Sequence, residues 1–229
     1  MSAFLALLKR EMQAIFLSPV AYACGILSLL VSGFCFMYVL LSFDPQTPFA
    51  LKDLVFRFFA GFIVSWFVQI FLISAITMRL FSEEKRTGTI EALLTAPVTD
   101  VQVVLAKYLG ALLYYALLWL PSLGYFFILG QKGLDWKLLG GTYLGIALVG
   151  VMAVAVGCLA SALCTSQIVA ALLSCTALTA LLFGPPMFAD KAQWDWLRKT
   201  LEYLNVLPMG SHTLLGDFCQ GLGSLGHVF

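Results

Sequence analysis

Long apolar runs without a charged residue recur along this chain, and their lengths predict helices that cross a membrane. A spanning helix needs about 20 predominantly apolar residues, and a charge at its centre costs about 2.5–3.5 kcal/mol. By these criteria we expect spans at 21–41, 58–78, 103–129, 138–163 and 168–183. Barrel strands would alternate over about ten residues instead, so the pattern predicts an all-α polytopic membrane protein.

Local signals predict where these spans end. A single uncharged stretch holds the last two spans, and we expect the polar Cys164-Thr165-Ser166-Gln167 to form the turn between them. Gly184-Pro185-Pro186 is expected to end the fifth span, because proline disfavours the continuation of a helix. Lys107, near the start of the third span, is expected to snorkel to the interface on its long aliphatic stem.

Residues 2–17 precede the first span and carry an amphipathic pattern, which predicts a helix lying in the membrane surface. The apolar side comprises Phe4, Leu5, Leu8, Met12, Ile15 and Phe16, and the polar side comprises Lys9, Arg10 and Gln13. A signal peptide is the alternative interpretation. The apolar run that follows is, however, longer than the 7–15 residues typical of a signal peptide.

Composition agrees with a membrane protein and excludes several other classes. Hydrophobic residues make up 61% of the 229 positions and charged residues 11%, too few charges to cover a soluble domain. The mean hydropathy is +0.96. The net charge of +1 and the absence of a long basic run argue against a nucleic-acid partner.

The sequence contains no recognisable catalytic, cofactor-binding or metal-binding site. It has no Gly-Lys dipeptide, so the phosphate-binding loop of nucleotide hydrolases cannot be present. His212 and His227 stand fifteen positions apart without further ligands at a suitable spacing. The six cysteines form no C-x-x-C pair and are interpreted as small packing residues: Cys24, Cys35, Cys158, Cys164, Cys175 and Cys219.

The segment between the second and third spans holds the densest charge cluster in the chain, from Arg79 to Glu91. Gly88 is expected to break it, and a short amphipathic helix is expected over 89–95, ended by Pro97. Thr99 and Gln102 then form a predicted capping box for the third span. Physical reasoning alone leaves open whether this is an ordinary helix on the membrane surface.

The string EEKRTGTIEALLTAPV in this segment resembles the signature of ABC-2 type transporter permeases, and it looks most like the gliding-motility-associated group. The matching positions are Glu84, Gly88, Thr89, Glu91, Leu93, Leu94 and Pro97. In that family the segment, here 83–97, is a coupling helix that docks on a separate ATPase subunit. The resemblance therefore implies that the ATPase is contacted by Glu84, Arg86, Gly88, Thr89, Glu91, Leu94 and Pro97.

The resemblance also implies partners and a location. ATP and magnesium would be held by the ATPase subunit, and a second permease subunit, identical or different, would complete a dimer in membrane lipid. The implied function is export across the bacterial cytoplasmic (inner) membrane. With the N-terminus inside, the 13 lysines and arginines divide six to seven between the two sides, so the orientation rests on the resemblance.

The chain departs from the family in its number of spans, since such permeases usually have six. We expect a sixth span beyond Phe229, with 189–229 as an outer segment that places Trp194, Trp196 and Tyr203 in the aromatic belt. The alternative is a non-transporting scaffold or assembly factor derived from the same fold.

Two polar or small-residue patterns inside the spans are also open to two interpretations. Ser65 and Gln69 either line a translocation path or make interhelical hydrogen bonds. Gly141-x-x-x-Gly145 and Gly157-x-x-x-Ser161 favour close helix packing inside the chain over a dimer seam.

Overall fold

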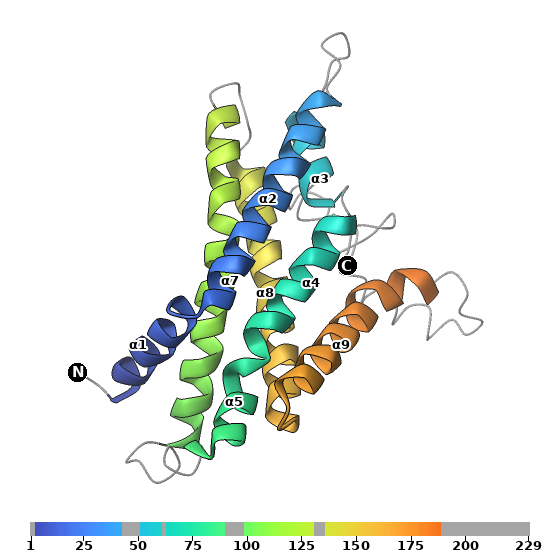
Figure 1. The fold of residues 1–229 in the computed structure, drawn as a ribbon. Coiled ribbons are helices and arrows are strands. Elements are labelled where there is room, and N and C mark those ends of the chain that lie inside the picture. The colour runs from blue at the N-terminus through green and yellow to red at the C-terminus, as the bar shows by residue number, and fades with distance from the viewer. Residues whose placement is uncertain (1–2, 43–50, 61–62, 90–98, 131–135, 189–229) are drawn as a thin grey trace, which may run out of the picture. The chain divides into compact units, whose positions relative to one another are not determined.

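The computed structural model describes residues 3–42, 51–60, 63–89, 99–130 and 136–188, and within these ranges the regular structure is entirely helical (Figure 1). Only short turns interrupt the helices. The elements are α1 (Ala3–Phe16), α2 (Pro19–Leu41), α3 (Leu51–Ala60), α4 (Ile63–Thr77), α5 (Arg79–Thr87), α7 (Asp100–Gly130), α8 (Trp136–Leu163) and α9 (Gln167–Phe188).

Five helical segments are long and apolar enough to cross a membrane. They are Pro19–Leu41, Ile63–Thr87, Asp100–Ile128, Trp136–Leu163 and Gln167–Pro185. The second segment combines α4 and α5, which follow one another with only Met78 between them. The prediction of an all-α polytopic membrane protein with five spans is therefore confirmed for the described part of the chain.

The second span begins later than predicted. Phe58 and Phe59 belong to α3 and are buried there, whereas Arg57 on the same helix is exposed. The helix is thus amphipathic, which explains why the charge-free run starting at Phe58 was misassigned to the span. Trp66 of α4 donates a hydrogen bond from Nε1 to the Phe59 carbonyl at 2.8 Å.

The fifth candidate span ends at Pro185, inside the predicted Gly184-Pro185-Pro186, but the helix does not stop there, because α9 continues to Phe188. Proline fixes φ near −65°, a value that a helix accepts; its cost is the lost hydrogen bond and a clash with the preceding turn. Neighbouring helices can compensate this cost in membrane proteins. Phe183, one turn before the prolines, stacks on Phe67 with ring centroids 4.3 Å apart.

Contacts divide the chain into two compact units. The first comprises Met1–Leu29, Val68–Trp119 and Gly150–Leu178, and the second comprises Leu30–Phe67, Leu120–Val149 and Thr179–Phe229. The second unit has an aromatic core, in which Phe59 stacks on Phe126 at 5.4 Å and Phe58 meets Phe126 edge-on at 5.3 Å. Such ring pairs contribute beyond simple burial, so this core fixes α3 against α7.

In the first unit, α7 holds the start of α2 and the end of α1. Tyr114 is buried and donates a hydrogen bond from its hydroxyl to the Ala21 carbonyl at 2.6 Å. Its ring meets Phe16 edge-on at 5.8 Å. Leu72 and Leu118 complete the buried cluster around it.

Small residues let α8 approach its neighbours closely in the first unit. A Cβ atom added at Gly157 would lie 2.7 Å from Cβ of Thr77, and one at Gly150 would lie 2.8 Å from Cζ of Tyr115. Real Cβ atoms essentially never lie so close, so a side chain at either position would force Thr77 or Tyr115 to shift. The Gly157-x-x-x-Ser161 motif therefore packs inside the chain, as the favoured interpretation predicted.

Candidate functional site

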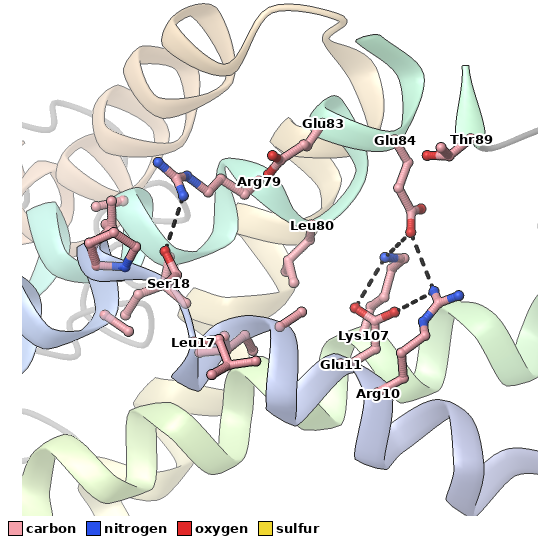
Figure 2. Close-up of a pocket in the computed structure, with 17 residues that line it drawn as sticks. Arg10, Glu11, Leu17, Ser18, Arg79, Leu80, Glu83, Glu84, Thr89 and Lys107 are labelled. Atoms are coloured by element: carbon pink, nitrogen blue, oxygen red, sulfur yellow. Dashed lines mark hydrogen bonds and ion pairs between the residues drawn. The ribbon is translucent and has the colours of Figure 1, made fainter. Parts of the chain in front are cut away.

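Four charged side chains meet in the first unit where the apolar α4 gives way to the charged α5 (Figure 2). Lys107 of α7 donates from Nζ to Glu84 Oε1 at 2.8 Å and to Glu11 Oε2 at 3.2 Å. Arg10 Nη2 lies 2.7 Å from Glu11 Oε1 and 3.5 Å from Glu84 Oε1. We call these four residues the ion-pair network; it contains two positive and two negative charges and links α1, α5 and α7.

Three of the four members of the network are largely removed from water, and Arg10 is half exposed. The side-chain exposure is 3% for Lys107, 9% for Glu11 and 18% for Glu84. The Lys107 ammonium also lies 5.6 Å from the centroid of the Phe81 ring, a cation–π arrangement. The prediction that Lys107 snorkels to the interface is therefore wrong, because two carboxylates meet its charge inside the protein.

A glycine on α7 allows α1 to bring Glu11 close to Lys107. A Cβ atom at Gly110, three residues after Lys107, would lie 3.5 Å from Cβ of Glu11 and 3.7 Å from Cδ1 of Ile15. Larger side chains at Gly110 would push α1 away from α7. The close approach of the two helices is thus what permits the buried ion pair.

A second set of contacts joins α5 to α8 by capping each helix with a side chain from the other. Ser161 of α8 accepts hydrogen bonds from the N–H groups of Phe81 and Ser82, at 3.0 and 3.2 Å, and donates to the Met78 carbonyl at 3.0 Å. Lys85 of α5 donates in return to the Ala162 carbonyl, near the C-terminus of α8. Backbone N–H and C=O groups that would be unpaired at a helix end thus find hydrogen-bond partners on the neighbouring helix.

Replacing Ser161 with alanine should destabilise this junction, because the N–H groups of Phe81 and Ser82 lose their side-chain acceptor at once, whereas the Met78 carbonyl keeps Ser82 Oγ as a donor. Each unmet buried group costs about 1–3 kcal/mol, so we expect a clear fall in thermal stability in detergent, measured by size-exclusion chromatography after heating. Ser166→Ala, an exposed serine in the turn between α8 and α9, is the control. Equal stability of the two variants would contradict the capping role.

The exposed end of α5, together with the two residues after it, contains most of the described residues that the sequence assigns to ATPase contact. Gly88 ends α5 with a left-handed φ of +72°, which confirms the predicted break. Arg86, Gly88 and Thr89 are exposed there. Glu84 instead points inward to Lys107, which leaves its Oε1 engaged within the chain.

Several other predicted features can be placed. The capping box is confirmed, since Thr99 Oγ1 accepts from the Gln102 N–H and Gln102 Oε1 accepts from the Thr99 N–H, both at 3.4 Å. The turn between α8 and α9 falls at residues 164–166, as predicted. Outside the described residues lie Glu91, Leu93, Leu94, Pro97, Trp194, Trp196, Tyr203, His212, Cys219, His227 and the outer segment 189–229.

The two residues suggested for a translocation path differ in burial. Ser65 is half-buried, whereas Gln69 is only 6% exposed and its Oε1 has no hydrogen-bond partner in the described part of the chain. A path between two subunits would require exposure on the single chain. The burial of Gln69 therefore favours a role inside the chain, and the pathway role of Ser65 stays a prediction.

Comparison with known proteins bears on this geometry. A family model described as ABC-2 family transporter protein matches residues 42–197, which is more than half of the chain. The chain belongs to this ABC-2 family. It is a multi-pass membrane protein and a permease subunit of an ABC transporter. Neither the curated proteins nor the solved structures include a match to it.

The range matched by the ABC-2 family contains only part of the ion-pair network. Glu84 and Lys107 lie within residues 42–197, whereas Arg10 and Glu11 on α1 precede it. The network therefore connects the N-terminal helix to the part of this ABC-2 permease that identifies the family.

Proposed function

We propose that this permease subunit works in an exporter of the bacterial cytoplasmic membrane, driven by ATP that a separate subunit hydrolyses with magnesium. Two permease subunits, identical or different, would pair with two ATPase subunits. Family membership and the absence of a Gly-Lys dipeptide support this division of roles. The sequence between Glu84 and Pro97 further suggests the gliding-motility-associated group.

The ion-pair network is the observation that carries this proposal. The exposed end of α5 and the two residues after it, Arg86 to Thr89, begin two positions after Glu84, and Glu84 is held by Lys107 of α7. Because Lys107 also pairs with Glu11, a displacement of α5 by a bound ATPase subunit would act on α7 and α1 together. A force applied to α5 outside the membrane would therefore reach α7 and α1 through these ion pairs.

The proposed cycle is a shift between two states of the permease dimer. An ATPase subunit can bias such an equilibrium only if its contacts differ between the states. Closure of two ATPase subunits on ATP would move the attached α5 ends and so favour one state. ATP hydrolysis would release that bias and return the dimer to the other state.

The test is co-purification of the permease with a candidate P-loop ATPase subunit, sought first among the neighbouring reading frames. Arg86→Glu reverses an exposed charge on α5 and should lower the recovered ATPase about tenfold, the factor that corresponds to about 1.4 kcal/mol. Lys9→Glu reverses an exposed charge on α1 and is the matched control. Both variants should insert and elute as the wild type does.

Two outcomes would contradict the proposal. Full recovery of the ATPase with Arg86→Glu would remove this end of α5 from the interface, and failure of the wild-type chain to bind any P-loop subunit would favour the scaffold. Orientation is checked with Thr87→Cys, an exposed position that a membrane-impermeant maleimide should reach only from the cytosolic side. Labelling from the opposite side would invert the topology.

A further inference from the structure

The second span is interrupted at Met78, the single residue between α4 and α5. Ser161 of α8 lies at this interruption, where its Oγ accepts from the N–H groups of Phe81 and Ser82 and donates to the Met78 carbonyl. A side chain that inserts into the hydrogen bonds of a helix is a known cause of a kink. The Ser82 Oγ also donates to the Met78 carbonyl, and such bonds to the preceding turn often bend helices. The span therefore has a defined break where α5 begins.

The helix that precedes this break is firmly packed. Ile70, Leu72 and Ile73 of α4 are at most 5% exposed. Thr77, the last residue of α4, lies so close to α8 that a Cβ atom at Gly157 would find no room. Because closely packed helices resist small displacements, a movement of α5 relative to α4 has to start after Thr77.

The two sides of α5 have different surroundings. Ser82 and Lys85, three positions apart on one side, bond to the end of α8. Leu80, Glu83 and Glu84 recur at helical spacing on another side and line a cavity of about 790 Å³, which α1 also lines (Figure 2). Protein interiors leave few voids larger than a water molecule, so this space can admit a movement of the helix.

One ion pair beside the cavity favours movement of α5 towards α1. Arg10 Nη2 on α1 lies 3.5 Å from Glu84 Oε1 on α5, beyond the about 2.7–2.9 Å usual for a charged hydrogen bond. Arg10 is half exposed, so its side chain can adjust to a new position of its partner. A shift of α5 towards α1 would shorten this contact and would stretch the hydrogen bonds to Ser161 on α8.

We propose that Met78 is a hinge at which α5 swings away from the end of α8 and towards α1, closing the cavity. In this structure Ser161 holds α5 in the open position. In the closed position the N–H groups of Phe81 and Ser82 leave Ser161, and Glu84 bonds Arg10 directly. Hinges of this kind are residues at the ends of elements, as Met78 is. The use of the hinge in coupling rests on the proposed function, because the ATPase subunit would move α5 by its exposed end.

The hinge is tested on the permease alone, as the full chain in nanodiscs, by hydrogen–deuterium exchange measured with mass spectrometry. Each swing breaks the hydrogen bonds to Ser161, so the exchange of the Phe81 and Ser82 amides measures how often α5 opens from α8. Ala14→Trp fills the cavity from α1 and should slow this exchange about tenfold, the factor that corresponds to about 1.4 kcal/mol. Exchange in α4 should stay unchanged. Ala14→Leu should act in the same direction but less, because leucine fills less of the cavity.

The matched control is Ala6→Trp, which places the same side chain on α1 at an exposed residue that does not line the cavity. Its exchange should equal that of the wild type. A general disturbance of the fold would speed exchange, whereas the hinge requires slower exchange. Unchanged or faster exchange in both Ala14 variants would therefore overturn the proposal.

A second readout separates the hinge from the proposed function. In complex with the ATPase subunit, Ala14→Trp should keep co-purification, because the exposed end of α5 is untouched, and should lower ATPase stimulation by a similar factor. Ala6→Trp should keep both. Slowed exchange with unchanged stimulation would overturn the use of the hinge in coupling. Failure of the wild-type chain to bind an ATPase subunit would contradict the proposed function, and the exchange measurement would then decide the hinge by itself.

Discussion

Replacing Lys107 with methionine is expected to cost about 3–5 kcal/mol of stability, the cost of removing one partner from a buried ion pair. Methionine preserves much of the volume of the side chain but supplies no charge to Glu11 and Glu84. Arg10 then remains as the sole cation of the network and is itself half exposed, at 52%. The measurement is the fraction of the chain that stays monodisperse in detergent after heating.

Two further variants separate the ion pair from a general loss of charge. Lys9→Met removes an exposed lysine from α1 and should leave stability unchanged. Glu11→Gln combined with Lys107→Met removes one charge of each sign, so it should recover part of the stability that Lys107→Met loses. If the double variant is as unstable as the sum of its single changes, the two charges are not coupled and the network has no energetic role.

If the proposed function is correct, Lys107→Met should also reduce the effect of the permease on the activity of the ATPase subunit. The Lys107 Nζ atom donates hydrogen bonds to both Glu84 on α5 and Glu11 on α1. ATPase co-purification with Lys107→Met should persist, because the exposed end of α5 is untouched. ATPase stimulation by the permease should fall, which separates coupling from binding.

The helical architecture was readable from the sequence because the length of an uncharged run is a local property. Such runs also show where a turn must fall, and the polar Cys164-Thr165-Ser166 segment between α8 and α9 is one that the structure confirms. Errors arose where tertiary packing overrides a local signal. Pro185 and Pro186 remain helical in α9, and Phe58 belongs to α3 and not to the span.

The candidate site was only half readable for the same reason. Gly88 and the pair Thr99 and Gln102 act on their own backbone, so short motifs sufficed to predict them. Lys107 and Glu11 are 96 positions apart, and no local pattern connects them. One signal was available: Glu11 lies three positions after Leu8 and four before Ile15, on the face predicted to be apolar.

Replacing Gly88 with valine is expected to uncouple the exposed end of α5 from the segment that follows. Gly88 has a φ of +72°, and an L-residue in this left-handed region costs about 1–2 kcal/mol, more for a β-branched side chain. Among the described residues, no atom outside its immediate chain neighbours lies within 4 Å of a Cβ added there, so we expect valine to act through the backbone. The Gly88 N–H, which bonds the Lys85 carbonyl at 3.4 Å, would lose the geometry that ends α5.

The expected result is a drop of about tenfold in ATPase stimulation by Gly88→Val, the factor that about 1.4 kcal/mol of backbone strain produces in an equilibrium. Gly88→Asn is the matched control, because asparagine tolerates the left-handed conformation far better than valine and should keep most of the stimulation. Thermal stability should change little in either variant, since Gly88 is exposed and a Cβ there would meet no atom of the described residues beyond its chain neighbours. Equal loss in the valine and asparagine variants would show that the glycine is needed for the absence of a side chain, as in a contact surface, and not for its φ.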